Sequence, residues 1–211
     1  RNYFWGFLLA GLASFTKVSG LALIPALFAE ILIYDRGFFQ VKKLGDKAIF
    51  LAVGFFLSVS GFLFYLLWNY ILWGDFFQFV KIQREHWFET FAPFGQGLLN
   101  VVLSLDGKSG IEKYTLGYAQ IAAFAIALIL SLFSFFKIRI SYGIYALLAL
   151  WFPFSMSFWV SMLRYVLVIF PMYIALSLLS KNMIFALIWI TLSLAILVTF
   201  SLLFVQYGPV L

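Results

Sequence analysis

The sequence predicts an all-α fold, namely a polytopic helical membrane protein with about six membrane segments and one large non-cytoplasmic loop. Of the 211 residues, 65% are hydrophobic and only 10% are charged, whereas about 25% of the residues in a soluble domain are charged. Several apolar runs approach the ~20 residues that cross a bilayer as a helix. Runs such as IAAFAIALILSLFSFF lack the alternation that a transmembrane β-barrel would show.

We expect a single transmembrane domain, 1–211. Because Arg1 directly precedes an apolar run, we also expect the chain to be the C-terminal part of a longer protein. The first apolar region, 3–34, is interrupted at 14–20 by SFTKVSG. As one straight helix it would measure ~48 Å, too long for the ~30 Å hydrocarbon core, and two full spans do not fit. The sequence therefore predicts one span at 18–34, preceded by a shorter tilted or re-entrant helix.

Further spans are predicted where apolar runs lie between polar segments. A loop at 35–47 separates the first span from a second one at 48–72. A long polar stretch, 73–117, follows, and residues 94–105 within it are predicted to form an interfacial helix. The remaining spans are expected at 118–136, 142–157, 164–180 and 183–205.

The basic residues predict the orientation of the chain. One set of loops carries seven Lys and Arg residues, most of them close to helix ends, and the opposite set carries five. Since cytoplasmic loops are enriched in Lys and Arg, the stretch 73–117 is placed on the outer or lumenal face. The expected location is the cell membrane in a prokaryote or the endoplasmic reticulum in a eukaryote. These loops account for the net charge of +6, so no nucleic-acid partner is indicated.

The composition excludes several kinds of site. The chain has no cysteine, which excludes disulfides, thiolate metal sites and a cysteine nucleophile, and it has only one histidine. The sequence contains no Walker A motif, no Rossmann glycine fingerprint, no HExxH and no GxSxG. No cofactor is therefore evident, while a requirement for a divalent metal is left open.

The stretch 73–117 carries most of the side chains that could perform chemistry. It contains five of the eight acidic residues and the only histidine, His86. Carboxylates and an imidazole can act as general acid or base, which makes Asp75 and His86 candidates, and Arg84 can bind phosphate. The alternative is an amphipathic loop helix whose charges face solvent. On a helix, one face would be shared by Gln83, His86 and Trp87.

Two basic residues outside this stretch are candidates for binding an anion. Lys17 interrupts an apolar region, where burying a basic residue costs ~2.5–3.5 kcal/mol on insertion scales. It is expected to face a cavity or a partner, unless its ammonium group reaches the membrane surface. Arg164 lies at the outer end of a predicted span, beside Trp159 and Tyr165. It is either an anion clamp or an ordinary interfacial anchor.

Four segments match a family pattern in order along the chain: GFLLAGLASFTKVSGLALIP, WGDFFQFVKIQREHW, SYGIYALLALWFPFS and SMLRYVLVIFPMYIAL. Between residues 7 and 176 the chain thereby resembles the PIG-V-like mannosyltransferases of the GT-C glycosyltransferase superfamily. The resemblance implies an integral-membrane hexosyltransferase that uses a polyprenyl-phosphate-linked sugar donor. The sugar would pass, with inversion, to a glycan, lipid or protein acceptor on the non-cytoplasmic face, among the membrane lipids.

The resemblance also implies roles for individual residues. Phe76 and Leu163 stand where the family usually has proline. The family's catalytic acid lies in an outer loop upstream of this chain, which leaves the catalytic residue unknown, with Asp75 and His86 as supporting candidates. Substrate binding is expected from the residues that fall on the basic, loop and RY motifs and from the neighbouring cation, namely Lys17, Gln83, Arg84, Trp87, Arg164 and Tyr165.

Two other classes of function are open at the level of sequence. A transporter or flippase-like protein would have interrupted helices at matching positions of its two halves, and only the break at 16–20 is evident. A non-catalytic membrane assembly subunit would pack against its partners through small residues. Gly54–Ser58 and Gly6–Ala10 have the spacing that such packing requires.

Overall fold

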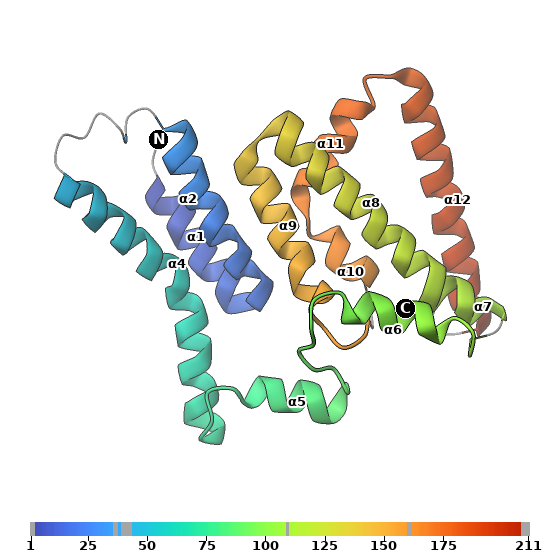
Figure 1. The fold of residues 1–211 in the computed structure, drawn as a ribbon, viewed down its shortest axis with the longest axis horizontal. Helices are drawn as coiled ribbons and strands as arrows, with labels where there is room; N and C mark the ends of the chain where they lie inside the picture. Colours follow the sequence, from blue (N-terminus) through green and yellow to red (C-terminus); the bar gives the residue numbers. More distant parts are fainter. Residues whose placement is uncertain (1–2, 36–37, 39–43, 109, 160–161, 208–211) are drawn as a thin grey trace.

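Figure 1 shows the fold in a computed structural model, which describes residues 3–35, 38, 44–108, 110–159 and 162–207. The predicted all-α fold is confirmed for this part of the chain, which contains one isolated β-bridge and no strand. In chain order, the elements are α1 (Tyr3–Thr16), η1 (Val18–Ala22), α2 (Leu23–Tyr34), α4 (Leu44–Trp73), α5 (Gln78–His86), α6 (Gln96–Ser104), α7 (Gly110–Lys113), η2 (Tyr114–Tyr118), α8 (Ala119–Phe133), η3 (Ser134–Ile138), α9 (Ile140–Phe154), α10 (Met162–Leu167), α11 (Phe170–Leu179) and α12 (Met183–Tyr207).

Three helical stretches of the described chain are long and apolar enough to cross a membrane: Gly45–Trp73, Gly110–Ile138 and Met183–Gln206. Their length and composition support a membrane protein. Four further apolar stretches have only 10–17 residues. A 14-residue helix such as α1 rises ~21 Å, less than the ~30 Å hydrocarbon core. The structure therefore supports three spans, and both the larger number and the single outer loop stay predictions.

The chain reverses direction at Lys17, so that α1 and the η1–α2 segment form a helical hairpin (Figure 1). Lys17 has an extended backbone, with φ −153° and ψ 135°, between α1 and the 3-10 helix η1. Gly20 permits the tight corner, because a Cβ there would overlap the backbone of Ala13. The helix predicted at 18–34 is found as the apolar stretch Val18–Tyr34, preceded by the shorter helix α1, while its crossing of a membrane stays a prediction.

Small residues bring α1 close to α4. A Cβ added at Gly54 would overlap the ring of Phe7. Ser14 Oγ donates to the carbonyl oxygen of Ser58 at 3.1 Å, and interhelical hydrogen bonds of this kind stabilise helix pairs in membranes. The small-residue face at Gly54–Ser58 therefore packs against a helix of the same chain.

A second bundle is formed by α8, α9, α10 and α11. Its centre is apolar, because hydrophobic side chains from all four helices and from the connection between α10 and α11 meet there. The residues without solvent exposure in this core are Ala127, Ala146, Met162, Ile169 and Ala175.

The continuous span predicted at 164–180 is interrupted, because α10 and α11 are separate helices. Pro171 lies in the first turn of α11 and lacks the N–H group that a continuing helix needs. Backbone groups released inside an apolar bundle must find other partners. Here tyrosine hydroxyls donate to the carbonyl oxygens at the break, from Tyr145 to Val168 at 3.1 Å and from Tyr173 to Leu167 at 2.9 Å.

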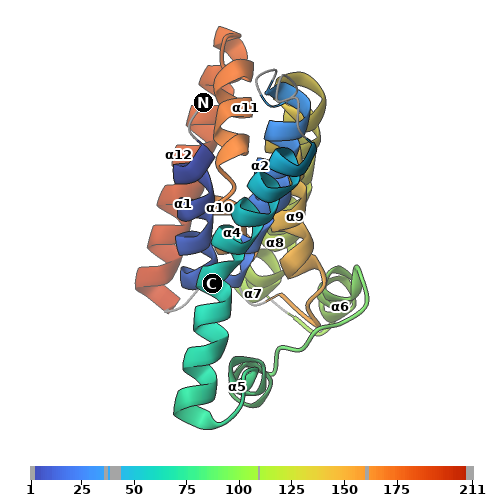
Figure 2. The same ribbon diagram turned by 90° about the vertical axis from the view of Figure 1, so that its left-hand side faces the viewer.

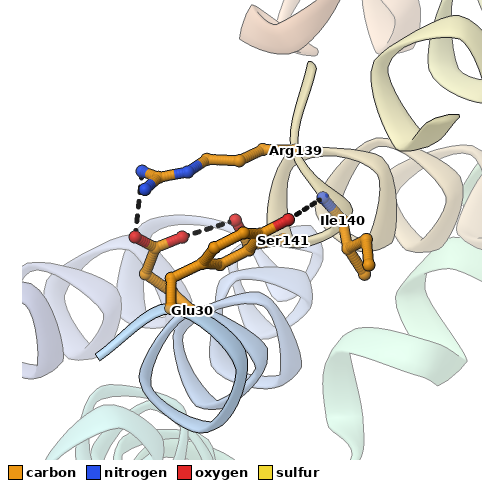
Figure 3. A network of polar contacts seen from close by, with 5 residues as sticks. Glu30, Arg139, Ile140 and Ser141 are labelled. Atoms are coloured by element: carbon orange, nitrogen blue, oxygen red, sulfur yellow. Dashed lines mark hydrogen bonds and ion pairs between the residues drawn. The ribbon is translucent and has the colours of Figure 1, made fainter. Parts of the chain in front are cut away.

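Figure 3 shows the polar network that ties α2 to the start of α9. Glu30 Oε1 lies 2.9 Å from Arg139 Nη1, and Ser141 Oγ donates to Glu30 Oε2 at 2.8 Å. The Tyr34 hydroxyl accepts the N–H group of Ile140 at 3.1 Å, and the Arg139 guanidinium lies 4.7 Å from the centre of the Tyr34 ring. The network holds the hairpin against the second bundle.

Candidate functional site

Several segments far apart in the sequence converge at the end of the molecule where α5 and α6 lie (Figure 1). Figure 2 shows that α5 and the last part of α4 project beyond the other helices. The segment after α5 returns toward the end of α9, where residues 91 and 156 form the isolated β-bridge. This end of the molecule therefore gathers α5, the returning segment, the end of α9, α10 and the corner of the α1–η1 hairpin.

A cavity of ≈ 120 Å³ lies between these segments. Its polar lining consists of Lys17 from the hairpin corner, Gln83 from α5, Glu89 from the returning segment and Tyr165 from α10. Mostly apolar walls with a few convergent polar groups are typical of ligand sites, so this cavity is the candidate functional site. The apolar lining comes from Val18, Phe79, Val80, Phe91, Phe152 and Met156.

Lys17 is the cation of the cavity. Its Nζ lies 4.4 Å from the centre of the Tyr165 ring, a cation–π contact. Although part of the side chain is exposed, burial lowers the pKa of Lys17, and the positive charge of Arg164 lowers it further. An anion bound near both cations would relieve their repulsion, so the electrostatics of this corner favour an anionic ligand.

Glu89 is the carboxylate of the cavity, and it is only 7% exposed. The carbonyl oxygen of Gln83 accepts the N–H groups of both Trp87 (3.0 Å) and Glu89 (3.2 Å), which fixes the chain at the end of α5. Between them Phe88 has φ 55°, in the left-handed region that bulky residues rarely adopt. This turn leaves Phe88 exposed and Glu89 buried. Burial raises the pKa of Glu89.

The residues after Glu89 are bound to the end of α9. The Thr90 N–H donates to Ser157 Oγ at 3.0 Å, and the Ser157 N–H donates to the Thr90 carbonyl oxygen at 2.8 Å. The Ala92 N–H donates to the carbonyl oxygen of Ser155 at 2.9 Å. Together with the hydrogen bonds to the Gln83 carbonyl oxygen, this pairing fixes the chain on both sides of Glu89.

Three of the predicted substrate-binding residues line the cavity, namely Lys17, Gln83 and Tyr165. Arg164 is exposed beside it, close enough for its charge to act on Lys17 and on Tyr165. The pKa of Tyr165 is raised by burial first and then by the negative charge of Glu89, with Arg164 opposing the change. Residues from both halves of the chain thus form one electrostatic unit.

The other candidates from the sequence lie outside the cavity lining. Asp75 binds Lys81 at 2.6 Å and accepts the Phe77 N–H at 2.8 Å. The hydrogen bond from Lys81, followed by that from Phe77, lowers the pKa of Asp75. This pair fixes the turn that precedes α5, on the solvent side. Three further candidates are exposed and do not line the cavity: Arg84, His86 and Trp87.

Glu89 is a site residue that the sequence pattern does not predict. Helical spacing favours the face shared by Gln83 and His86, whereas α5 ends at His86 and the chain turns before Glu89. A signal was present, because Glu89 stands between the aromatic pair Trp87–Phe88 and the apolar segment at 91–94. An acid in such a setting is a candidate for burial.

An apolar groove of ≈ 440 Å³ adjoins the cavity, and the two share Val18 and Phe152 as walls. The groove runs between the η1–α2 arm of the hairpin and α9. It has no charged residue in its lining, which comprises Val18, Ser19, Leu21, Ala22, Pro25, Leu148, Trp151 and Phe152.

Comparisons of the chain with models of known protein families, with curated proteins and with solved structures gave no match. The resemblance to PIG-V-like mannosyltransferases therefore stays a prediction from the sequence motifs. Within the part of the chain that the structure describes, no three side chains of His, Asp or Glu come together as metal ligands. The question of a divalent metal is left open.

Proposed function

We propose that the chain is the substrate-holding part of an integral-membrane glycosyltransferase, a mannosyltransferase by its resemblance, that uses a polyprenyl-phosphate-linked sugar. The observation that carries the proposal is the cavity with Lys17, which shares two walls with an apolar groove. A ligand that fits both has an anionic head and a long apolar chain. A polyprenyl phosphate has this form, with its phosphate at Lys17 and its chain in the groove.

The chemistry proposed is transfer of the sugar to an acceptor hydroxyl, with the lipid phosphate as leaving group. Negative charge grows on the phosphate as the glycosidic bond breaks, and cations fixed beside it lower the barrier. Lys17 and Arg164 repel each other in the absence of an anion. As negative charge grows on the phosphate, its attraction to both cations increases. This increase favours the transition state over the bound donor.

The test is a Lys17→Met variant of the full-length protein in membranes, assayed for transfer of labelled mannose from polyprenyl-phosphate mannose to the acceptors in those membranes. Removal of one group that stabilises developing charge is expected to lower the turnover about 100-fold. Lys81→Met is the matched control, because Lys81 pairs with Asp75 outside the cavity lining, and it should transfer at the wild-type rate. Equal turnover in Lys17→Met and wild type would refute the proposed role of the cavity.

A transporter is the alternative that the structure bears on most directly. The break between α10 and α11 gives the second half an interrupted helix, as that alternative requires. The break at 16–20 in the first half is instead the corner of a hairpin, so the two interruptions do not match. The assembly subunit also loses support, because its small-residue face at Gly54–Ser58 is occupied by α1.

A further inference from the structure

A second cavity, of ≈ 260 Å³, lies between α2, the start of α9 and Phe170, the first residue of α11. Among the residues that the structure describes, it shares no lining residue with the cavity that contains Lys17. What it binds is therefore independent of the proposed function.

The second cavity is charged at one end and apolar at the other. Leu23, Leu27 and Glu30 line it with the i, i+4 and i+7 spacing of one helix face, and Glu30 lies about 10 Å further along the axis of α2 than Leu23. At the charged end, Arg139 Nη1 lies 2.9 Å from the Glu30 carboxylate, to which Ser141 Oγ donates at 2.8 Å. A molecule that fits this cavity has a polar group near Arg139 and an apolar part near Leu23.

The second cavity lies where a lipid of the bilayer can enter it. Arg139 directly follows the helical stretch Gly110–Ile138, which is long and apolar enough to cross a membrane. The end of such a span lies near the lipid head groups, and α9 runs back from there alongside α8 (Figure 1). Phe170 in the cavity wall is 43% exposed, so the cavity opens on the surface. Its charged end therefore faces the head groups, and its apolar end faces the hydrocarbon.

The charges at this end of the molecule favour an anion. The ion pair with Glu30 uses one end of the Arg139 guanidinium, and the side chain remains 31% exposed, so its other N–H groups can bind a phosphate oxygen. Arg139 also precedes the first turn of α9, whose N–H groups add partial positive charge. Two exposed lysines, Lys137 in η3 and Lys181 just after α11, lie at the same end of the second bundle (Figure 1). Glu30 offsets only part of this charge.

We propose that the second cavity binds an anionic glycerophospholipid of the surrounding bilayer. One acyl chain lies along the α2 face between Leu27 and Leu23, and the phosphate accepts hydrogen bonds from Arg139, which Glu30 holds in place. Basic residues beside a pocket between membrane helices are typical of sites for anionic lipid head groups. The orientation predicted from Lys and Arg places this end in the cytoplasmic leaflet, whose negative surface potential comes from such lipids.

The test measures lipid binding to the purified full-length protein in detergent micelles by native mass spectrometry. The probes are dioleoyl phosphatidylglycerol and dioleoyl phosphatidylcholine, which have the same acyl chains and differ in head-group charge. The wild-type protein should retain one molecule of phosphatidylglycerol. It should bind this lipid about tenfold more tightly than phosphatidylcholine, because the choline group brings a positive charge among the basic residues. Equal affinity for the two lipids would overturn the inference.

Two variants test the two ends of the cavity. Leu23→Trp fills the apolar end and should lower the affinity for phosphatidylglycerol about tenfold or more, whereas Leu32→Trp adds the same side chain at an exposed position of α2 and should bind as the wild type does. Arg139→Lys keeps a positive charge beside Glu30 but loses the planar guanidinium that can bind a carboxylate and a phosphate together. Its affinity for phosphatidylglycerol should fall about tenfold. Wild-type affinity in Leu23→Trp or in Arg139→Lys would overturn the inference.

A second readout does not depend on any variant. Phosphatidylglycerol with a diazirine in one acyl chain, mixed into phosphatidylcholine vesicles that contain the full-length protein, should label α2 and α9 on irradiation. Excess unlabelled phosphatidylglycerol should remove this label, whereas excess glycerol phosphate, which has no acyl chain, should leave it in place. The control is α12, whose apolar stretch is 0% buried and whose labelling should not respond to competition. A label on α2 and α9 that phosphatidylglycerol leaves in place, or that glycerol phosphate removes, would overturn the inference.

Discussion

Replacing Gly11 by alanine is expected to push α1 away from α4. A Cβ at Gly11 would lie 2.5 Å from the carbonyl oxygen of Leu57, where ordinary van der Waals contact begins at 3.4 Å. The two helices must therefore separate locally by about 0.9 Å, because a carbonyl oxygen inside a helix is fixed and cannot move aside as a flexible side chain could. The nearby hydrogen bond from Ser14 to Ser58, now 3.1 Å long, would stretch beyond a useful length.

The expected size of the effect follows from these terms. Overpacking in a well-packed interface costs typically about 1–3 kcal/mol, and an interhelical hydrogen bond in a membrane contributes about 0.6 kcal/mol. Replacement of glycine by alanine inside a helix favours folding by up to ~1 kcal/mol. Gly6→Ala carries the same propensity gain, since a Cβ at Gly6 meets only a leucine methyl group at 3.4 Å. Because the propensity gain cancels, the two variants should differ in unfolding free energy by about 1.6–3.6 kcal/mol.

The measurement is unfolding of the full-length protein in mixed micelles with an increasing fraction of SDS, followed by tryptophan fluorescence. Gly6→Ala should unfold at or above the wild-type SDS fraction and Gly11→Ala well below it. Because Lys17 follows α1 directly, Gly11→Ala should also weaken binding at the cavity. If Gly11→Ala were as stable as Gly6→Ala, the close approach of α1 to α4 would be refuted.

Three further predictions concern polar contacts. Arg139→Met should destabilise the fold by about 1–3 kcal/mol, because Glu30 loses its charged partner. Adding Glu30→Gln should restore part of the lost stability in the same SDS unfolding assay. Additive losses from the two substitutions would contradict an interaction between Glu30 and Arg139. Ser157→Ala removes the acceptor of the Thr90 N–H and should speed hydrogen exchange of that amide, whereas unchanged exchange would exclude the hydrogen bond. Because burial raises the pKa of Glu89 in the folded protein above 4.5, this carboxyl stabilises the fold while it is protonated, and its contribution to wild-type stability should be lost as the pH rises through the folded pKa. Glu89→Gln should lack this decline; parallel stability curves for the two proteins would refute the buried carboxyl.

Helix formation in this chain was largely predictable because it depends on long apolar runs. The helix Gly110–Ile138 contains the span predicted at 118–136, and the helix predicted at 94–105 is found as α6. The number of spans was harder to predict, since a run such as 3–34 satisfies the hydrophobic pattern whether it is straight or folded back at Lys17. The helix break before Pro171 follows from the missing N–H group of proline. The hydrophobic pattern does not reveal it, because the apolar run continues through the break.

The cavity depends on contacts that local patterns do not contain. The placement of Glu89 requires the pairing of Thr90 with Ser157, which are 67 residues apart in the chain. It also requires the left-handed backbone conformation of Phe88. A glycine at this position would have indicated such a conformation, whereas a phenylalanine does not. Lys17 and Arg164 were predictable as candidates, because isolated basic residues in apolar surroundings are costly. Their convergence on one cavity was not predictable, because it follows from the packing of the hairpin.

The polar contacts between α2 and α9 fix one end of the η1–α2 arm of the hairpin, so that a small rotation there displaces the other end. Glu30 and Arg139 fix one end of the arm, and Val18, which forms a wall of both the cavity and the groove, lies near the other end. Twelve residues of helix separate Glu30 from Val18, about 18 Å of rise. A rotation of about 5° at these contacts would move Val18 by roughly 1.5 Å at that length. The width of the groove between this arm and α9 therefore depends on the tilt of the arm about the contacts of Glu30 and Arg139.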